Sequence, residues 1–157
     1  MLKKGIFLVL LMFLCNCSTK YYICNYDRIP KEFATKERID KAKSYAEYFF
    51  NKCDTKDYSE IQDFELDINT KRYLSPEGIE ARCKKINEKY GKITVGELYK
   101  MKAASFPKNF RDYFVFKAKM EKTDSLKYVV VQSYRDKNLV VERLFITSNL
   151  FPKKIKK

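Results

Sequence analysis

Residues 113–147 read YFVFKAKMEKTDSLKYVVVQSYRDKNLVVERLFIT, and this stretch decides the fold class. It contains three runs that are rich in Val, Phe, Tyr and Ile and that are separated by turn-forming residues. The runs cover 113–122, 126–135 and 139–147, and the links are Thr123-Asp124 and Asp136-Lys137-Asn138. Links this short join antiparallel neighbours, because a parallel connection needs a crossover of a dozen or more residues. The stretch therefore predicts a three-stranded antiparallel meander.

Upstream of the meander, residues 93–104 predict one more strand, and the segment before Gly91 has a helical hydrophobic period. Ser75 is suited to cap that helix, Pro76 to occupy its first turn and Gly91 to end it. Another amphipathic helix is predicted after Thr35, where apolar residues recur at three- and four-residue steps. The order predicts an α+β fold, in which N-terminal helices pack on a curved four-stranded antiparallel sheet.

Four segments carry a resemblance to the nuclear-transport-factor-2-like superfamily, whose fold is a cone-shaped, cystatin-like α+β domain. They are IDKAKSYAEYFF, KYGKITVGELYKMKA, YFVFKAKMEK and KYVVVQSYRDKNLVVERLFI. The resemblance covers residues 34–150 and is greatest to small, uncharacterised bacterial lipoproteins that carry this domain. It implies a cone that can hold a ligand and a sheet face through which such domains dimerise. No catalytic motif of the superfamily maps onto particular residues of this chain.

The N-terminus has the layout of an export signal. Lys3 and Lys4 precede an apolar stretch over residues 5–14, which is too short for a transmembrane helix of about twenty residues. We therefore expect residues 1–16 to be a signal peptide. An uncleaved anchor from Ile6 to Ile23 is an alternative.

The end of this stretch, Leu14-Cys15-Asn16-Cys17, resembles a bacterial lipobox, although Asn16 departs from the usual small residues. The resemblance implies lipid attachment at Cys17, whose thiol would carry the diacylglycerol as a thioether. Two or three acyl chains would hold the protein at a membrane of the cell envelope. Ser18 implies the outer membrane where the host has two membranes. Ordinary signal-peptidase cleavage after Cys17 is the other interpretation.

The remaining organisation follows from these predictions. Residues 17–33 are expected to form the lipidated N-terminus and a tether, residues 34–150 the domain and residues 151–157 a basic tail. The net charge of +13 is spread along the chain, and no nucleic-acid-binding signature accompanies it. We therefore expect no nucleic-acid partner.

The composition limits the chemistry. The chain contains no His, so that a Ser-His or Cys-His nucleophile pair within it is excluded. The cysteines of the domain lack C-x-x-C spacing, and the acidic residues form no calcium-binding loop. No cofactor, metal site or catalytic residue is predicted.

Cys53 and Cys83 lie on the apolar faces of the two predicted helices. A disulfide between them would tie the helices together in an exported protein and leave Cys24 unpaired. The alternative is that both residues are small buried hydrophobes.

The second face of the predicted sheet is more apolar than a solvent-exposed face should be. Two successive strands carry apolar residues on both of their sides, and we expect something to cover the face opposite the helices. The predicted interaction face contains Tyr128, Val130, Val141 and Phe145. The candidate partners are a second copy of the chain, another envelope protein or the folded-back tether.

Three functions remain open at this level. The absence of His and of catalytic motifs favours a non-enzymatic domain that binds a protein or an unidentified small molecule at the envelope. An isomerase- or dehydratase-type enzyme would instead use an Asp beside a Tyr inside the cone. The residues available for that role are Asp63, Asp67, Tyr45, Tyr99, Tyr113 and Tyr128. The third function is a structural subunit for envelope assembly.

Overall fold

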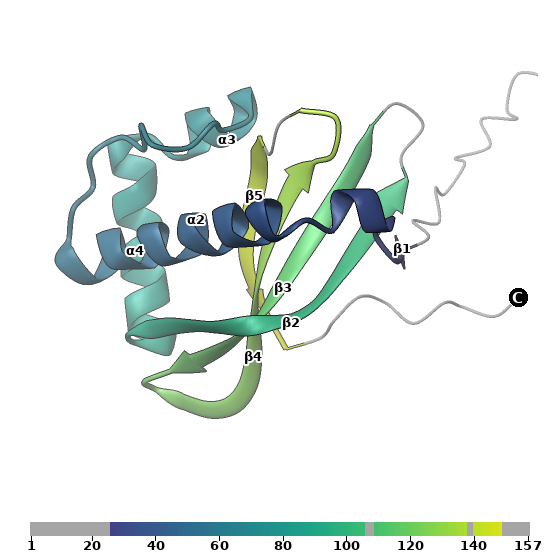
Figure 1. The fold of residues 1–157 in the computed structure, drawn as a ribbon. Helices are drawn as coiled ribbons and strands as arrows, with labels where there is room; N and C mark the ends of the chain where they lie inside the picture. The colour runs from purple at the N-terminus through teal and green to yellow at the C-terminus, as the bar shows by residue number, and fades with distance from the viewer. Residues whose placement is uncertain (1–25, 106–108, 138–139, 149–157) are drawn as a thin grey trace, which may run out of the picture.

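The structure is a computed structural model and describes residues 26–105, 109–137 and 140–148. It is an α+β fold in which helices lie against an open antiparallel sheet (Figure 1). The elements, in chain order, are β1 (Tyr26–Asp27), the 3-10 helix η1 (Lys31–Phe33), α2 (Lys36–Thr55), α3 (Ile68–Tyr73), α4 (Pro76–Tyr90), β2 (Ile93–Ser105), β3 (Phe110–Met120), β4 (Thr123–Tyr134) and β5 (Val141–Thr147).

The sheet confirms the antiparallel meander but has one strand more than predicted. Its order is β1-β2-β3-β4-β5, and every neighbouring pair is antiparallel. The short strand β1 pairs Tyr26 with Ala104 and Asp27 with Ala103 of β2. In chain order the helices therefore come after β1 and before β2, although the two strands are neighbours in the sheet. A strand of two residues is too short to show a period, which is why the sequence pattern did not indicate it.

The folded part of the chain also starts earlier than the predicted residue 34. Ile29 is buried, and η1 follows it within the segment that was expected to be a tether. The predicted signal peptide over 1–16, Cys17 and the basic tail over 151–157 lie outside the described residues.

Both long helices begin at the predicted caps. The Thr35 side chain accepts a hydrogen bond from the amide of Arg38, and the Ser75 side chain accepts one from the amide of Gly78. Gly91 ends α4 with a φ of 65°, a left-handed value that favours glycine. Local sequence therefore sets both helix starts and the C-terminal end of α4.

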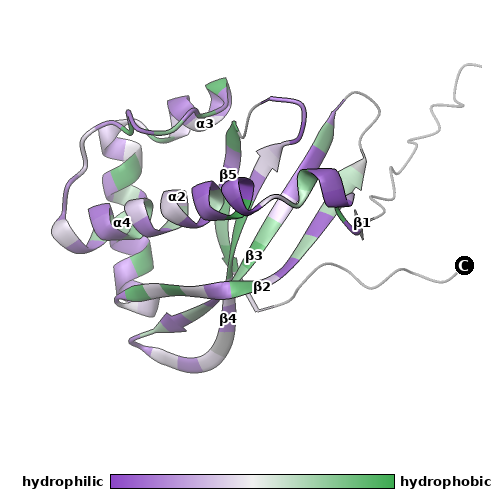
Figure 2. Ribbon diagram, viewed as in Figure 1, coloured by the Kyte–Doolittle hydropathy of each residue, from purple (hydrophilic) through white to green (hydrophobic). Residues whose placement is uncertain are grey.

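The main hydrophobic core lies between the helices and one face of the sheet. Alternating hydrophobic and hydrophilic residues along the elements produce this face (Figure 2). Tyr45 and Phe49 of α2 are buried against Phe114 and Phe116 of β3 and Val129 of β4 within one cluster. Register shifts in β2 interrupt its pairing with β3, and such irregularities bend a strand.

A smaller core lies on the opposite face of the sheet. It consists of Ala104, Tyr113, Val115, Tyr128 and Val130, all of them buried. Part of this face is therefore buried within the single chain, and the partner that the sequence analysis expected there stays a prediction.

A buried charge cluster joins the start of α2 to the sheet. Asp112 of β3 is fully buried, and its carboxylate contacts the guanidinium groups of Arg38 at 2.9 Å and Arg135 at 2.7 Å. The ring of Phe33 lies 5.9 Å from the Arg38 guanidinium carbon and 5.0 Å from that of Arg135. Removing one partner from a buried pair typically costs about 3–5 kcal/mol. This cluster therefore holds η1 and α2 in a fixed position on the sheet.

A disulfide joins α2 to α4. It links Cys53 and Cys83, whose Cα atoms are 4.8 Å apart, and both residues are buried. The Asn87 side-chain amide donates a hydrogen bond of 3.1 Å to the carbonyl oxygen of Cys53 and adds a second link between the helices.

Reduction of this disulfide should destabilise the oxidised protein. With 30 residues separating the cysteines, loop-closure entropy predicts a loss of about 3–4 kcal/mol in the free energy of unfolding. Urea unfolding with and without reductant, followed by far-ultraviolet circular dichroism, measures this loss. A C53A/C83A variant is the control and should not respond to reductant. Alkylatable thiols at both positions in folded, exported protein would contradict the pairing.

Candidate functional site

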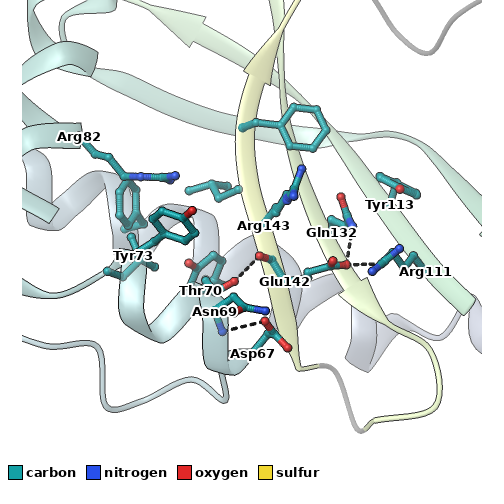
Figure 3. A pocket seen from close by; sticks show the side chains of 15 residues that line it. Asp67, Asn69, Thr70, Tyr73, Arg82, Arg111, Tyr113, Gln132, Glu142 and Arg143 are labelled. Carbon is teal, nitrogen blue, oxygen red and sulfur yellow. Dashed lines mark hydrogen bonds and ion pairs between the residues drawn. The ribbon is translucent and has the colours of Figure 1, made fainter. Parts of the chain in front are cut away.

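The candidate site is an open groove at the β5 end of the sheet. Its volume is about 740 Å³, and it runs from α2, α3 and α4 over β5 to the second face of the sheet (Figure 3). Its lining contains Tyr45, Phe49, Asp67, Asn69, Thr70, Tyr73, Leu74, Arg82, Arg111, Tyr113, Gln132, Glu142, Arg143, Leu144 and Phe145. The groove therefore joins part of the main core to polar side chains of both sheet faces.

The segment before α3 forms one end of the groove. Leu66 makes a parallel bridge with Val141. The Asp67 amide donates a hydrogen bond to the Val141 carbonyl oxygen, and the Val141 amide donates one to the Glu65 carbonyl oxygen, each of 2.9 Å. The Asp67 carboxylate then caps α3 by accepting a hydrogen bond of 3.0 Å from the Asn69 amide. The chain thus pairs briefly with β5 and turns away from it.

Glu142 is the central carboxylate of the groove. It forms an ion pair with Arg111 of β3 and accepts a hydrogen bond from the Gln132 side-chain amide (Figure 3). Its carbonyl oxygen accepts a hydrogen bond from the Thr70 hydroxyl. Burial alone would lower the pKa of Arg111, but hydrogen bonds to Tyr134 and Glu142 raise that pKa overall, so that the guanidinium stays charged.

Two further arginines lie along the groove. Arg82 comes from α4 and Arg143 from β5, and both are exposed. Within the described part of the chain, neither guanidinium takes part in an ion pair. The groove thus presents two cationic groups that a negatively charged ligand could reach.

Tyr45 forms part of the groove wall between the helices and the sheet. Burial raises the pKa of its phenol far above the usual value, and the charge of Arg82 partly opposes this effect. The hydroxyl therefore stays protonated at neutral pH.

Of the six residues that the sequence offered for catalysis, the structure brings three to the groove and places the other three elsewhere. Asp67, Tyr45 and Tyr113 line the groove, whereas Asp63 is exposed and does not belong to its lining. The rings of Tyr99 and Tyr128 contact each other instead, with centroids 4.9 Å apart.

The predicted interaction face is divided between the two sides of the sheet. Tyr128, Val130 and Phe145 share the second face, because Phe145 pairs with Val130. Val141, by contrast, belongs to the main core, and its assignment to the second face was wrong. A register shift beside Glu142 inserts one residue, and an inserted residue reverses the alternation of the side chains.

Sequence reasoning missed the polar side of the groove. Arg82, Arg111, Gln132 and Arg143 belong to four different elements and have no common spacing in the sequence. One signal was available: Glu142 and Arg143 are adjacent charges inside the otherwise apolar final strand.

Comparison of the chain with protein-family models, with curated proteins and with solved structures found no match. Among the described residues, no group of three or more Cys, Asp or Glu side chains is arranged to hold a metal ion. None of the helices in the described ranges is both long and apolar enough to span a bilayer.

The arrangement is suited to binding. Both carboxylates of the groove are already engaged, Glu142 with Arg111 and Gln132, and Asp67 with the first turn of α3. The arginines are hydrogen-bond donors only, the phenol of exposed Tyr73 can donate or accept, and Leu144 and Phe145 add an apolar surface. This combination favours an anionic ligand with apolar parts.

Replacing Glu142 with Gln should destabilise the domain. The pair with Arg111 is only 12–21% exposed, so its loss leaves a partly buried guanidinium without its counter-charge and should cost about 1–3 kcal/mol. Urea unfolding monitored by tyrosine fluorescence measures this cost. Glu47→Gln is the matched control, because the Lys43–Glu47 pair is exposed and should contribute less than about 0.5 kcal/mol. Equal losses in the two variants would contradict the assignment.

Proposed function

We propose that this chain is a lipid-anchored protein of the bacterial cell envelope whose domain binds a ligand or a protein in the β5 groove without catalysing a reaction. The observation that carries the binding half of the proposal is the groove itself, where exposed arginines adjoin apolar and aromatic side chains. Such a mixture of an apolar surface with a few polar groups is typical of binding sites.

The anchor half of the proposal rests on the sequence. Two lysines, a short apolar run and Leu14 three residues before Cys17 are the features of a lipoprotein signal. A lipid at Cys17 would place the domain close to the membrane surface, and the outer membrane would be its location in a host with two membranes.

We also propose that the domain is nuclear-transport-factor-2-like. In support, helices precede a bent antiparallel meander and cover one of its faces, as the resemblance implies. A homodimer through the second face remains a prediction, but Val130 and Tyr128 are buried within the single chain. Any contact there would have to use more exposed residues, such as Tyr99 and Phe145.

Cys17→Ala should abolish incorporation of radiolabelled palmitate and should cause unprocessed precursor to accumulate, because the acceptor thiol is lost. Cell labelling followed by gel electrophoresis of the immunoprecipitated protein measures both effects. Cys15→Ala is the matched control: it keeps a small residue before the acceptor and should be labelled normally. Normal labelling and processing of the Cys17 variant would show that the anchor assignment is wrong.

A further inference from the structure

We infer that the outer edge of β5 accepts an acidic polypeptide segment as an added strand. The inference rests on the proposed binding function and specifies the partner of the same groove. In β-strand addition, an extended peptide pairs its backbone with an exposed sheet edge, and alternate side chains enter flanking pockets. The edge position of β5, the chain segment already paired with it and the charges beside it all support this mode.

The first observation is the position of β5 in the sheet. It is the last strand of the order, and within the described residues no strand pairs with its outer side beyond the single bridge between Leu66 and Val141. The edge of a sheet presents backbone N–H and C=O groups that can pair with another chain. The stretch 143–146 therefore offers backbone groups for pairing.

The second observation is that this edge already accepts a chain segment. Residues 65–67 form two backbone hydrogen bonds of 2.9 Å with Val141. The Thr70 hydroxyl then donates a hydrogen bond to the carbonyl oxygen of Glu142, and α3 leads the chain away from the strand. A guest strand would continue from this point along 143–146 and would lie in the groove.

The third observation is charge. Arg143 lies on β5 itself, and Arg82 reaches toward β5 from α4 (Figure 3). An acidic segment would place its carboxylates on the second face beside Arg143 and its apolar side chains on the helix side against Leu144. Arg82 would add an attraction at longer range from the helix side.

The same charges disfavour a second copy of the chain at this edge. Pairing β5 with β5 of another copy would bring like charges at Arg143 together across the new interface. The net charge of each chain is +13, which adds a general repulsion. An acidic polypeptide fits the groove better than this basic chain does.

A short peptide of alternating Glu and Val tests the inference with the full-length chain in detergent micelles. Alternation places all Glu side chains on one face of a strand and all Val side chains on the other. The comparison peptide has the same sequence with an N-methyl group at every residue, which removes the backbone N–H donors of both strand edges. Isothermal titration calorimetry measures both affinities.

The unmodified peptide should bind, and the methylated peptide should bind at least about tenfold more weakly, because it cannot pair with β5. A double variant with Arg82→Glu and Arg143→Glu should bind the unmodified peptide at least about tenfold more weakly than the unaltered protein does, because the attraction between the groove and the peptide becomes repulsion. The control double variant, Lys84→Glu with Arg72→Glu, makes the same change in charge at exposed positions outside the groove lining and should keep affinity within about twofold.

Equal affinity for the two peptides, or no effect of the Arg82 and Arg143 changes, would overturn strand addition. A small tricarboxylate, tricarballylate, separates this failure from failure of the proposed function. If the binding of tricarballylate depends on Arg82 and Arg143 but the peptide does not bind, the inference of an added strand is wrong and the proposed binding groove still stands. If neither probe binds in the groove, both proposals are overturned.

Discussion

The covalent link between α2 and α4 is the constraint on which the groove depends. Helix α4 packs mainly against α2, and the Cys53–Cys83 disulfide joins the two helices within the buried core. Arg82 is the residue immediately before Cys83, so the disulfide also fixes the part of α4 that carries this arginine. The distance of α4 from β5, and with it the width of the groove, therefore depends on how α4 is held on α2.

The arginines of this protein have two different roles. Arg38 and Arg135 are largely buried and share Asp112, so their charges serve to hold η1 and α2 on the sheet. Arg82 and Arg143 are exposed at the groove and have no ion pair within the described residues. Removing one partner of a buried pair destabilises the fold, whereas exposed charges beside a cavity are available for recognition.

Local sequence predicted the elements well, because caps and periods are local properties. Ser75, Pro76 and Gly91 marked α4, and the turn residues within 113–147 marked the meander. The strand β1 was missed because only its pairing with β2 makes it a strand. The face of Val141 was missed because the extra residue beside Glu142 becomes visible only when β4 and β5 are aligned.

The candidate site was harder to predict than the fold. Tyr45, Tyr113 and Asp67 were recognised as polar groups that could face a cavity, and all of them line the groove. The arginines were not recognised, because a single charged residue on a helix or strand usually lies on a solvated surface. Only the three-dimensional arrangement of α4, β3 and β5 brings Arg82, Arg111 and Arg143 to one groove.

Site-specific photo-crosslinking in intact cells tests the central claim, that the β5 groove is where this domain binds its partner. A benzophenone amino acid replaces Tyr73, which is 70% exposed and lines the groove, or Tyr99, which is 46% exposed and lies outside the groove lining. A discrete adduct with a different protein is expected from position 73, whereas position 99 should give no adduct other than a dimer of this chain. Adducts with the same partner protein in equal yield from both positions, or such adducts from position 99 alone, would contradict the claim.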